Sequence, residues 1–161
     1  MYKQILVALD GSEFAEKIVP YVEALAKQFG SSVTLVRATM PAMALIAEMS
    51  GAGQAPMMDP TPILEAERQE TETYLSAMAD RLKAEGIAAD YKHPEGTPAE
   101  VILELARQPG VDLIAMTTHG RGGLQRAVLG SVADAVLRHA PCPVLLVRVL
   151  QPAGPHPAEA A

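Results

Sequence analysis

Asp112-Leu113-Ile114-Ala115-Met116-Thr117-Thr118 leads directly into His119-Gly120-Arg121-Gly122-Gly123, and this stretch decides the predicted fold. Its apolar part, Leu113 to Met116, is typical of a strand buried in a parallel sheet. Further on, Gly130-Ser131 opens a segment whose apolar residues recur at helical spacing. A strand, a glycine-rich loop and a helix start bring backbone N–H groups and the positive end of a helix dipole to one point. The stretch therefore predicts a phosphate-binding loop.

A second loop of the same kind follows the first apolar run of the chain. Ile5 to Leu9 predict another buried strand, and Asp10-Gly11-Ser12 comes directly after it. Ser12 is a favoured N-cap, and the pattern predicts one helix over residues 13–29 that Gly30 ends. Asp10 either belongs to a ligand site, caps the predicted helix, or begins a local turn with Gly11 and Ser12. A doubly wound sheet uses two such loops to bind a nucleotide at its switch point.

Strands and helices alternate along the chain, which predicts an α/β fold. The expected form is a doubly wound, five-stranded parallel sheet in a single domain, with helices on both faces and right-handed connections. Thr97-Pro98-Ala99-Glu100 is a capping box. The strands are predicted at residues 3–9, 32–38, 88–93, 112–116 and 144–147, and the helices at 13–29, from Thr61-Pro62 to Gly86, from Thr97 to Ala106, and 131–139.

Composition excludes several classes of protein. The chain has 161 residues, 49% of them hydrophobic, which suits one domain with its own core. A net charge of −6, scattered basic residues and the lack of Trp disfavour a nucleic-acid surface. The single Cys142 excludes an internal disulfide, and no apolar run reaches the ~20 residues of a membrane helix. No leader is recognised at the start, so we expect a soluble cytoplasmic protein with a disordered, Pro-rich tail at residues 151–161.

Taken together, the motifs resemble the universal stress protein family over residues 2 to 149. The resemblance implies a Rossmann-like domain over residues 1–150 that binds ATP, with Mg2+ on the phosphates. The matching segments are Ile5 to Ser12, Thr97 to Glu100, Asp112 to Ile114, Thr118 to Leu124, Gly130 to Ala133, and Pro141 to Val147.

The resemblance also implies which residues form the nucleotide site. ATP-binding members have the pattern G-x-x-G followed at a fixed spacing by G-[ST], which Gly120 and Gly130-Ser131 match. Thr117 stands where the first glycine is expected, so it either restricts the loop or donates its hydroxyl to a phosphate. Asp10 would lie near the ribose or a metal, and the backbone of Ala38 would meet the adenine. The implied cofactor-binding residues are Asp10, Ala38, Thr117, Thr118, His119, Gly120, Arg121, Gly122, Gly123, Gly130, Ser131, Val132 and Ala133.

Several residues keep two interpretations. Ser131 either caps its helix or donates to a phosphate, and His119 packs locally or serves chemistry. Arg121 and Arg126 are either solvated or meet phosphates. The methionine-rich segment 39–61, in which Ala42 to Met49 could be helical, is a binding surface or a mobile connection.

The histidines and Cys142 show no metal-ligand spacing, so no structural metal is assigned. The last strand, Val144 to Val149, is expected at the sheet edge beside the fourth strand. Pairing with its copy would cover this apolar edge and form a homodimer, as the resemblance also implies.

Three function classes remain. The first is a small ATP-binding stress or signalling protein with at most slow ATP hydrolysis. The second is a family member without nucleotide that acts as a dimeric, partner-binding module. The third is an adenylating enzyme, but that class carries Ser-Gly-Gly-x-Asp-Ser where this chain has Asp10-Gly11-Ser12. No general base, nucleophile or metal-activating cluster specifies a reaction.

Overall fold

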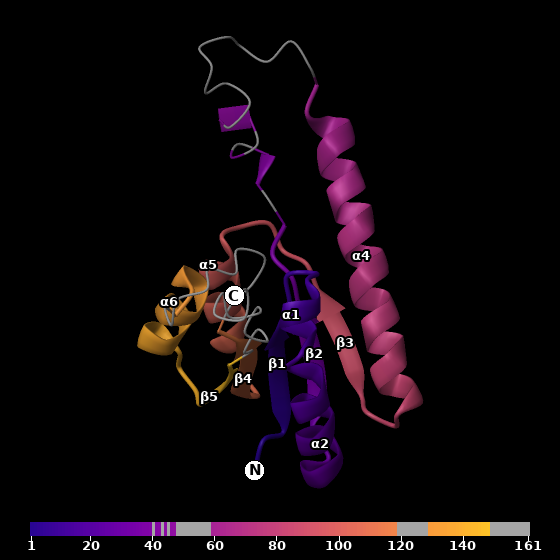
Figure 1. Cartoon of the computed structure of the whole chain (residues 1–161), viewed down its shortest axis with the longest axis vertical. Coiled ribbons are helices and arrows are strands. Elements are labelled where there is room, and N and C mark those ends of the chain that lie inside the picture. Colours follow the sequence, from indigo (N-terminus) through magenta and orange to yellow (C-terminus); the bar gives the residue numbers. More distant parts are fainter. Residues whose placement is uncertain (40, 43, 45, 48–58, 119–128, 149–161) are drawn as a thin grey trace, which may run out of the picture.

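Five parallel strands form one sheet in the order β3-β2-β1-β4-β5 (Figure 1). The chain runs outward from β1 to β2 and β3, and then returns to the other side of β1 for β4 and β5. The switch point therefore lies between β1 and β4, which confirms the doubly wound prediction. Both predicted edge strands, β3 and β5, are at the edges. The bounds are β1 Gln4–Ala8, β2 Ser32–Val36, β3 Ala89–Lys92, β4 Val111–Thr117 and β5 Val144–Val147.

This is a computed structural model, and it describes residues 1–39, 41–42, 44, 46–47, 59–118 and 129–148. The predicted tail, 151–161, and most of the methionine-rich segment lie outside these residues. Within that segment, Ala42, Ala44, Ile46 and Ala47 are helical, in keeping with the predicted short helix. No helix of the described ranges is both long enough and apolar enough to span a membrane.

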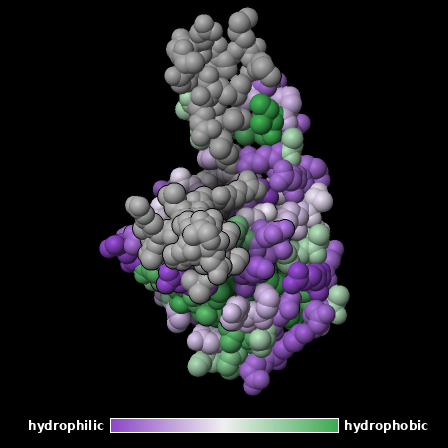
Figure 2. Space-filling model, in the orientation of Figure 1, coloured by the Kyte–Doolittle hydropathy of each residue, from purple (hydrophilic) through white to green (hydrophobic). Residues whose placement is uncertain are grey.

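Helices cover both faces of the sheet, as predicted (Figure 1). Strand residues alternate between the faces, so Ile5 and Val7 pack with α1, α2 and α4, whereas Leu6 packs with α5 and α6. Each face thus has its own apolar core, and Ile5, Val7 and Leu6 are at most 1% exposed. Figure 2 shows hydrophilic and hydrophobic residues interspersed over the described part of one face. The helices are α1 Glu13–Glu16, α2 Val19–Phe29, α4 Thr61–Ala84, α5 Pro98–Ala106 and α6 Ser131–His139.

The prediction of one helix over residues 13–29 is wrong, because the helix breaks at Lys17 and Ile18. Pro20 explains the break: it has no N–H to donate to the Glu16 carbonyl, and its ring would collide with that carbonyl. Pro20 instead occupies the first turn of α2, where its missing N–H costs nothing. Gly30 ends α2 with a left-handed φ of 65°, as predicted.

The capping box correctly predicts where α5 begins but not how it is capped. Thr97 is the N-cap, yet its side chain makes no capping hydrogen bond to the backbone. Its hydroxyl donates to the Glu100 carboxylate at 2.6 Å. A charge-assisted bond of this kind is stronger than one between neutral groups, so the two side chains of the box pair with each other.

Helix α4 is longer than the part of the sheet that it covers. Its first ten residues, Thr61 to Glu70, are mostly exposed, and full burial begins at Thr71. From there Leu75, Met78 and Leu82 cover β2 and β3 from one face of the sheet. The amino-terminal half of α4 therefore projects beyond the carboxyl edge of the sheet (Figure 1).

Candidate functional site

The two loops predicted from the sequence begin at the same edge of the sheet. Strands β1 and β4 are parallel neighbours, with Val7 opposite Ala115. The chain leaves β1 into Asp10-Gly11-Ser12 on the α1 side of the sheet, and it leaves β4 at Thr118 before α6 on the other side. Connections that depart to opposite faces open a crevice between them, where ligands bind in open α/β sheets.

The loop after β1 is held by Asp10. Its Oδ1 accepts hydrogen bonds from the Ser12 backbone N–H at 2.9 Å and from the Ser12 hydroxyl at 2.6 Å. Gly11 between them has a φ of 81°, which a side chain would disfavour. Ser12 Oγ also accepts from the Ala15 N–H at 3.2 Å, so Ser12 is the N-cap of α1 as predicted. The local-turn interpretation of Asp10 is thus confirmed, and the turn fixes its carboxylate at the end of β1.

Thr117 is the last residue of β4 and lies in regular register with Val147 of β5. It is only 6% exposed. Its backbone is extended, a conformation that suits a β-branched residue. The restriction expected from a threonine in place of the first motif glycine therefore does not arise at this position, because Thr117 still belongs to the strand.

Thr118 and Gly130 stand on either side of the segment in which the phosphate loop is predicted, and we call this pair the neck. The Gly130 N–H donates to the Thr118 carbonyl at 3.1 Å, while the Thr118 N–H donates to Val147 O at 3.0 Å. A Cβ added to Gly130 would lie 2.9 Å from Thr118 O, closer than real Cβ contacts. The close approach to Thr118, and not the backbone conformation, therefore requires glycine at this position, because any residue can adopt a φ of −60°.

Helix α6 begins directly at the neck. Its N-cap is Gly130, which provides no side-chain hydrogen bond. The suggestion that Ser131 caps the helix is therefore wrong: Ser131 is the first helical residue, and its side chain is exposed. Ala133 is 2% exposed and belongs to the core, so toward the crevice it can offer only its backbone N–H. The first N–H groups of a helix have no partner within it, and the dipole there favours an anion.

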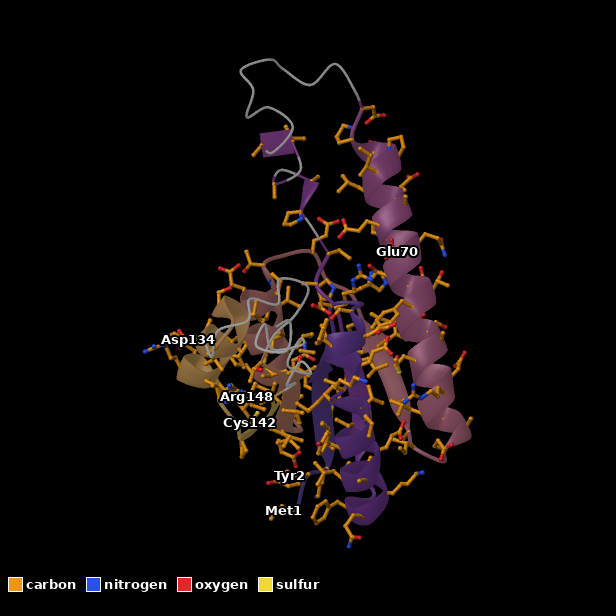
Figure 3. The ribbon with its side chains drawn as sticks, viewed as in Figure 1. Met1, Tyr2, Glu70, Asp134, Cys142 and Arg148 are labelled. Atoms are coloured by element: carbon orange, nitrogen blue, oxygen red, sulfur yellow. The ribbon has the colours of Figure 1, made fainter. Side chains whose placement is uncertain are left out.

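Two further titratable groups lie in α6 or just after it. Asp134, in the first turn, binds Arg138 at 2.9 Å, and this bond lowers the pKa of Asp134 (Figure 3). Cys142 is half-buried, and burial raises the pKa of its thiol, so it is a poor nucleophile. No group of three or more metal-binding side chains occurs among the described residues.

Ala38 follows β2 at the same edge of the sheet. The Leu9 N–H donates to Val36 O at 2.9 Å, which keeps the ends of β1 and β2 together. Ala38 is half-buried against the core under α5 and α6. The carboxyl ends of β1, β2 and β4 thus bring Asp10, Ala38 and Thr118 to one edge. His119, Gly120, Arg121, Gly122 and Gly123 lie outside the described residues and stay predictions.

One feature near the site was missed by the sequence reasoning. Arg37 is only 7% exposed, on the face of the sheet that α4 covers. It pairs with Glu70 at 3.6 Å, and its guanidinium carbon lies 5.9 Å from the centre of the Tyr74 ring. The alternation of β2 could have revealed it, because Val33, Leu35 and Arg37 fall on one face.

Comparison with known proteins agrees with this architecture. The model of the universal stress protein family matches residues 1–148. A universal stress protein of Methanocaldococcus jannaschii is 33% identical over 150 residues, covering 92% of this chain and 83% of the relative. One from Thermus aquaticus is 34% identical over 149 residues, covering 92% of this chain and 100% of the relative.

Solved structures share the fold. UspA of Lactobacillus plantarum superposes with a TM-score of 0.75 at 21% identity, covering 91% of this chain and 98% of its own. A universal stress protein in complex with cAMP has a TM-score of 0.63 at 23% identity, covering 91% and 97%. One from Archaeoglobus fulgidus, in complex with dAMP, has a TM-score of 0.59 at 22% identity, covering 90% and 97%.

Proposed function

The chain belongs to the universal stress protein family, and on this premise we propose that it is a cytoplasmic stress-response or signalling protein that binds ATP with Mg2+. The nucleotide would occupy the crevice between the ends of β1 and β4. The adenine would lie against the backbone of Ala38, and the triphosphate would lie over the neck and the start of α6. The predicted loop residues His119 to Gly123 would complete the phosphate contacts.

The neck is the observation that supports this proposal most strongly. Gly130 brings the end of β4 and the start of α6 within hydrogen-bond distance, at a place where a Cβ does not fit. The N–H groups of Ser131, Val132 and Ala133 then stand at the positive end of a nine-residue helix. Backbone donors of this kind bind phosphate without any particular side chain. The described residues therefore fit an anionic group at this end of the crevice.

Asp10 is the residue that fits a metal ion on the phosphates. Mg2+ in nucleotide sites keeps several waters and takes one or two carboxylates besides the phosphate oxygens. The turn with Ser12 holds Asp10 at the end of β1, next to the switch point. A dedicated cluster of protein ligands is not needed for this role.

The cAMP and dAMP complexes of proteins with the same fold support an adenine nucleotide as the ligand. ATP rather than a monophosphate is proposed because Gly120 and Gly130-Ser131 match the ATP-binding pattern, from which only Thr117, at the first glycine, departs. Binding, rather than turnover, would be the output. Within the described residues, no acid–base pair is held at the crevice to activate water, so any hydrolysis would be slow.

We also propose a homodimer through β5. This strand lies at the sheet edge beside β4, and all four of its residues are only partly buried. Its outer edge presents backbone groups that an antiparallel copy of the same strand could satisfy. A two-fold pairing of this kind closes on itself and leaves no further strand to add.

Mass spectrometry of the purified protein tests the proposal without assuming the nucleotide. We expect an adenine nucleotide to be released on denaturation of the wild type and to be reduced in Gly130→Val, in which the side chain enters the neck. Leu137→Ala is the matched control, because this exposed residue lies on the same helix. Equal amounts of nucleotide from Gly130→Val and Leu137→Ala would contradict the site.

A further inference from the structure

A groove of about 610 Å³ lies on the face of the molecule that α4 covers. It is lined by Gly11 from the β1–α1 loop, by Arg37 just after β2, and by one stripe of α4. That stripe includes Gln69, Glu70, Thr73 and Tyr74, whose spacing places them on the same side of the helix. Figure 3 marks Glu70 in the half of α4 that projects beyond the sheet. Pockets of this volume commonly hold small molecules.

Arg37 is paired only loosely with Glu70 at the base of this groove, while Asp10 and Glu16 add negative charge near Tyr74. The side chain of Arg37 is only 8% exposed, whereas that of its partner Glu70 is 69% exposed. Their 3.6 Å separation is longer than a normal hydrogen bond. An ion pair with one partner mostly in water contributes little, while a buried guanidinium needs a close anion to offset its desolvation. Glu70 is therefore a loose counter-ion that another anion can replace.

Arg37 is well prepared to hold such an anion. The Tyr74 ring lies 5.9 Å from its guanidinium carbon, within the range of a cation–π contact, and burial of Arg37 limits the movement of its side chain. A guanidinium offers a planar fork of N–H donors that matches two oxygens of a carboxylate or a phosphate. Gln69 and Thr73 add polar groups to the lining.

We propose that this groove is a second ligand site, which binds a small molecule through its phosphate or carboxylate group. Arg37 holds the anion, and Glu70 moves aside when it binds. Among the described residues, the lining includes none of Ala38, Thr117, Thr118 or Gly130 to Ala133. The inference therefore goes beyond the nucleotide crevice, which, as far as the described residues extend, meets the groove at the loop of Gly11.

The two charged residues predict opposite effects. Replacing Glu70 removes a competitor for Arg37, so the affinity for an added anion rises. Replacing Arg37 removes the binding group, so the affinity falls. A purely long-range effect of net charge would instead act equally at any glutamate of α4, and Glu72 provides that comparison because it is exposed on the same helix.

The test is an NMR titration of the 15N-labelled protein with inorganic phosphate and, separately, with benzoate. The amide signals of Gly11, Arg37 and Tyr74 report binding. Glu70→Gln should tighten binding of the preferred probe about two- to fivefold, the range expected for one exposed ion pair. Arg37→Gln should weaken it at least about tenfold, as loss of a charge-assisted contact does. The probe that binds more tightly identifies the ligand group as phosphate or carboxylate.

Control variants separate binding at Arg37 from a general effect of charge on α4. Glu72→Gln and Arg68→Gln, both exposed on α4 outside the lining, should change the dissociation constant less than about twofold. Arg37→Lys keeps the charge without the fork and should bind less tightly than the wild type, even if Arg37→Gln fails to fold. Gly130→Val should leave the groove titration unchanged, so a failure of the nucleotide proposal stays distinguishable. Equal affinities of Glu70→Gln and the wild type, or an undiminished titration of Arg37→Lys, would overturn the proposal.

Discussion

Gly130→Ala perturbs the neck by a single methyl group. The added Cβ would stand 2.9 Å from Thr118 O, so the end of β4 and the start of α6 must separate by a few tenths of an ångström. The hydrogen bond from Gly130 N to Thr118 O, now 3.1 Å, lengthens with them. The cost of weakening it is about 0.5–1.5 kcal/mol.

A second effect offsets part of this loss of stability. Gly130 has φ −60° and ψ 150°, which alanine adopts without strain. Replacing glycine at such a position stabilises by about 0.4–1 kcal/mol through the unfolded chain. The clashing atom is a backbone oxygen that cannot turn aside, so we expect a net loss of about 1–2 kcal/mol in the free energy of unfolding, measured by urea denaturation.

Nucleotide affinity has no such compensation. Moving the N–H groups of Ser131 to Ala133 away from the crevice weakens contacts to the phosphates, and loss of one such contact corresponds to about tenfold or more in affinity. Calorimetric titration with ATP, alongside the control Leu137→Ala, measures this directly. A Gly130→Ala protein that is as stable as the wild type and binds ATP equally well would refute the role of the neck.

Three further predictions concern Tyr74, the edge strand and turnover. Tyr74→Phe should leave the free energy of unfolding at pH 7 unchanged or raise it by about 1 kcal/mol in urea melts, because the buried hydroxyl lies near the Glu16 carboxylate but has no described partner within hydrogen-bond distance. Burial, together with the nearby Glu16 carboxylate, raises the pKa of Tyr74, so the folded protein keeps the neutral phenol. The contribution of this group to the free energy of unfolding is therefore constant below the unfolded pKa of about 10 and is lost as the pH rises above it. Tyr74→Phe should show less of this loss of stability at alkaline pH. Leu146→Lys in β5 should convert a dimer into a monomer in light scattering, and a monomeric wild type at micromolar concentration would end that proposal. Steady-state ATP hydrolysis should stay below about 1 per second, and a faster rate would require a catalytic group at the crevice.

The fold was largely predictable because its signals are local. Leu113 to Met116 and Ile5 to Leu9 are apolar runs that only a sheet covered on both faces can bury. Gly30 and Gly86 end helices with positive φ values of 65° and 79°, as their positions in the pattern suggest. Topology followed from the alternation of strands and helices and from the handedness of their connections.

The wrong predictions arose at residues that can play two structural roles. Pro20 can begin a helix or interrupt one, and here the helix breaks before it and Pro20 lies in the first turn of α2. The Thr97 hydroxyl can accept from a backbone N–H of the helix or donate to the nearby Glu100 carboxylate, and in the structure it donates to Glu100. Ser131 could have capped α6, but Gly130 is the N-cap because the neck leaves no room for a side chain there.

The candidate site was only partly predictable. The sequence pattern could place Asp10 and Gly130 at strand and helix ends, but the contact between Gly130 and Thr118 depends on how β4 and α6 meet in space. Arg37 was missed for the same reason. Its burial depends on α4, which is distant in the sequence and lies across it through Glu70 and Tyr74.

The most direct test of nucleotide binding at the crevice is calorimetric titration of ATP and Mg2+ into the wild-type protein stripped of bound nucleotide. We predict saturable binding of one ATP per chain, and NMR shifts at Gly130 and the amides of Ser131 to Ala133. Absence of heat and of shifts at these amides, at millimolar ATP with a folded protein, would contradict the proposed site.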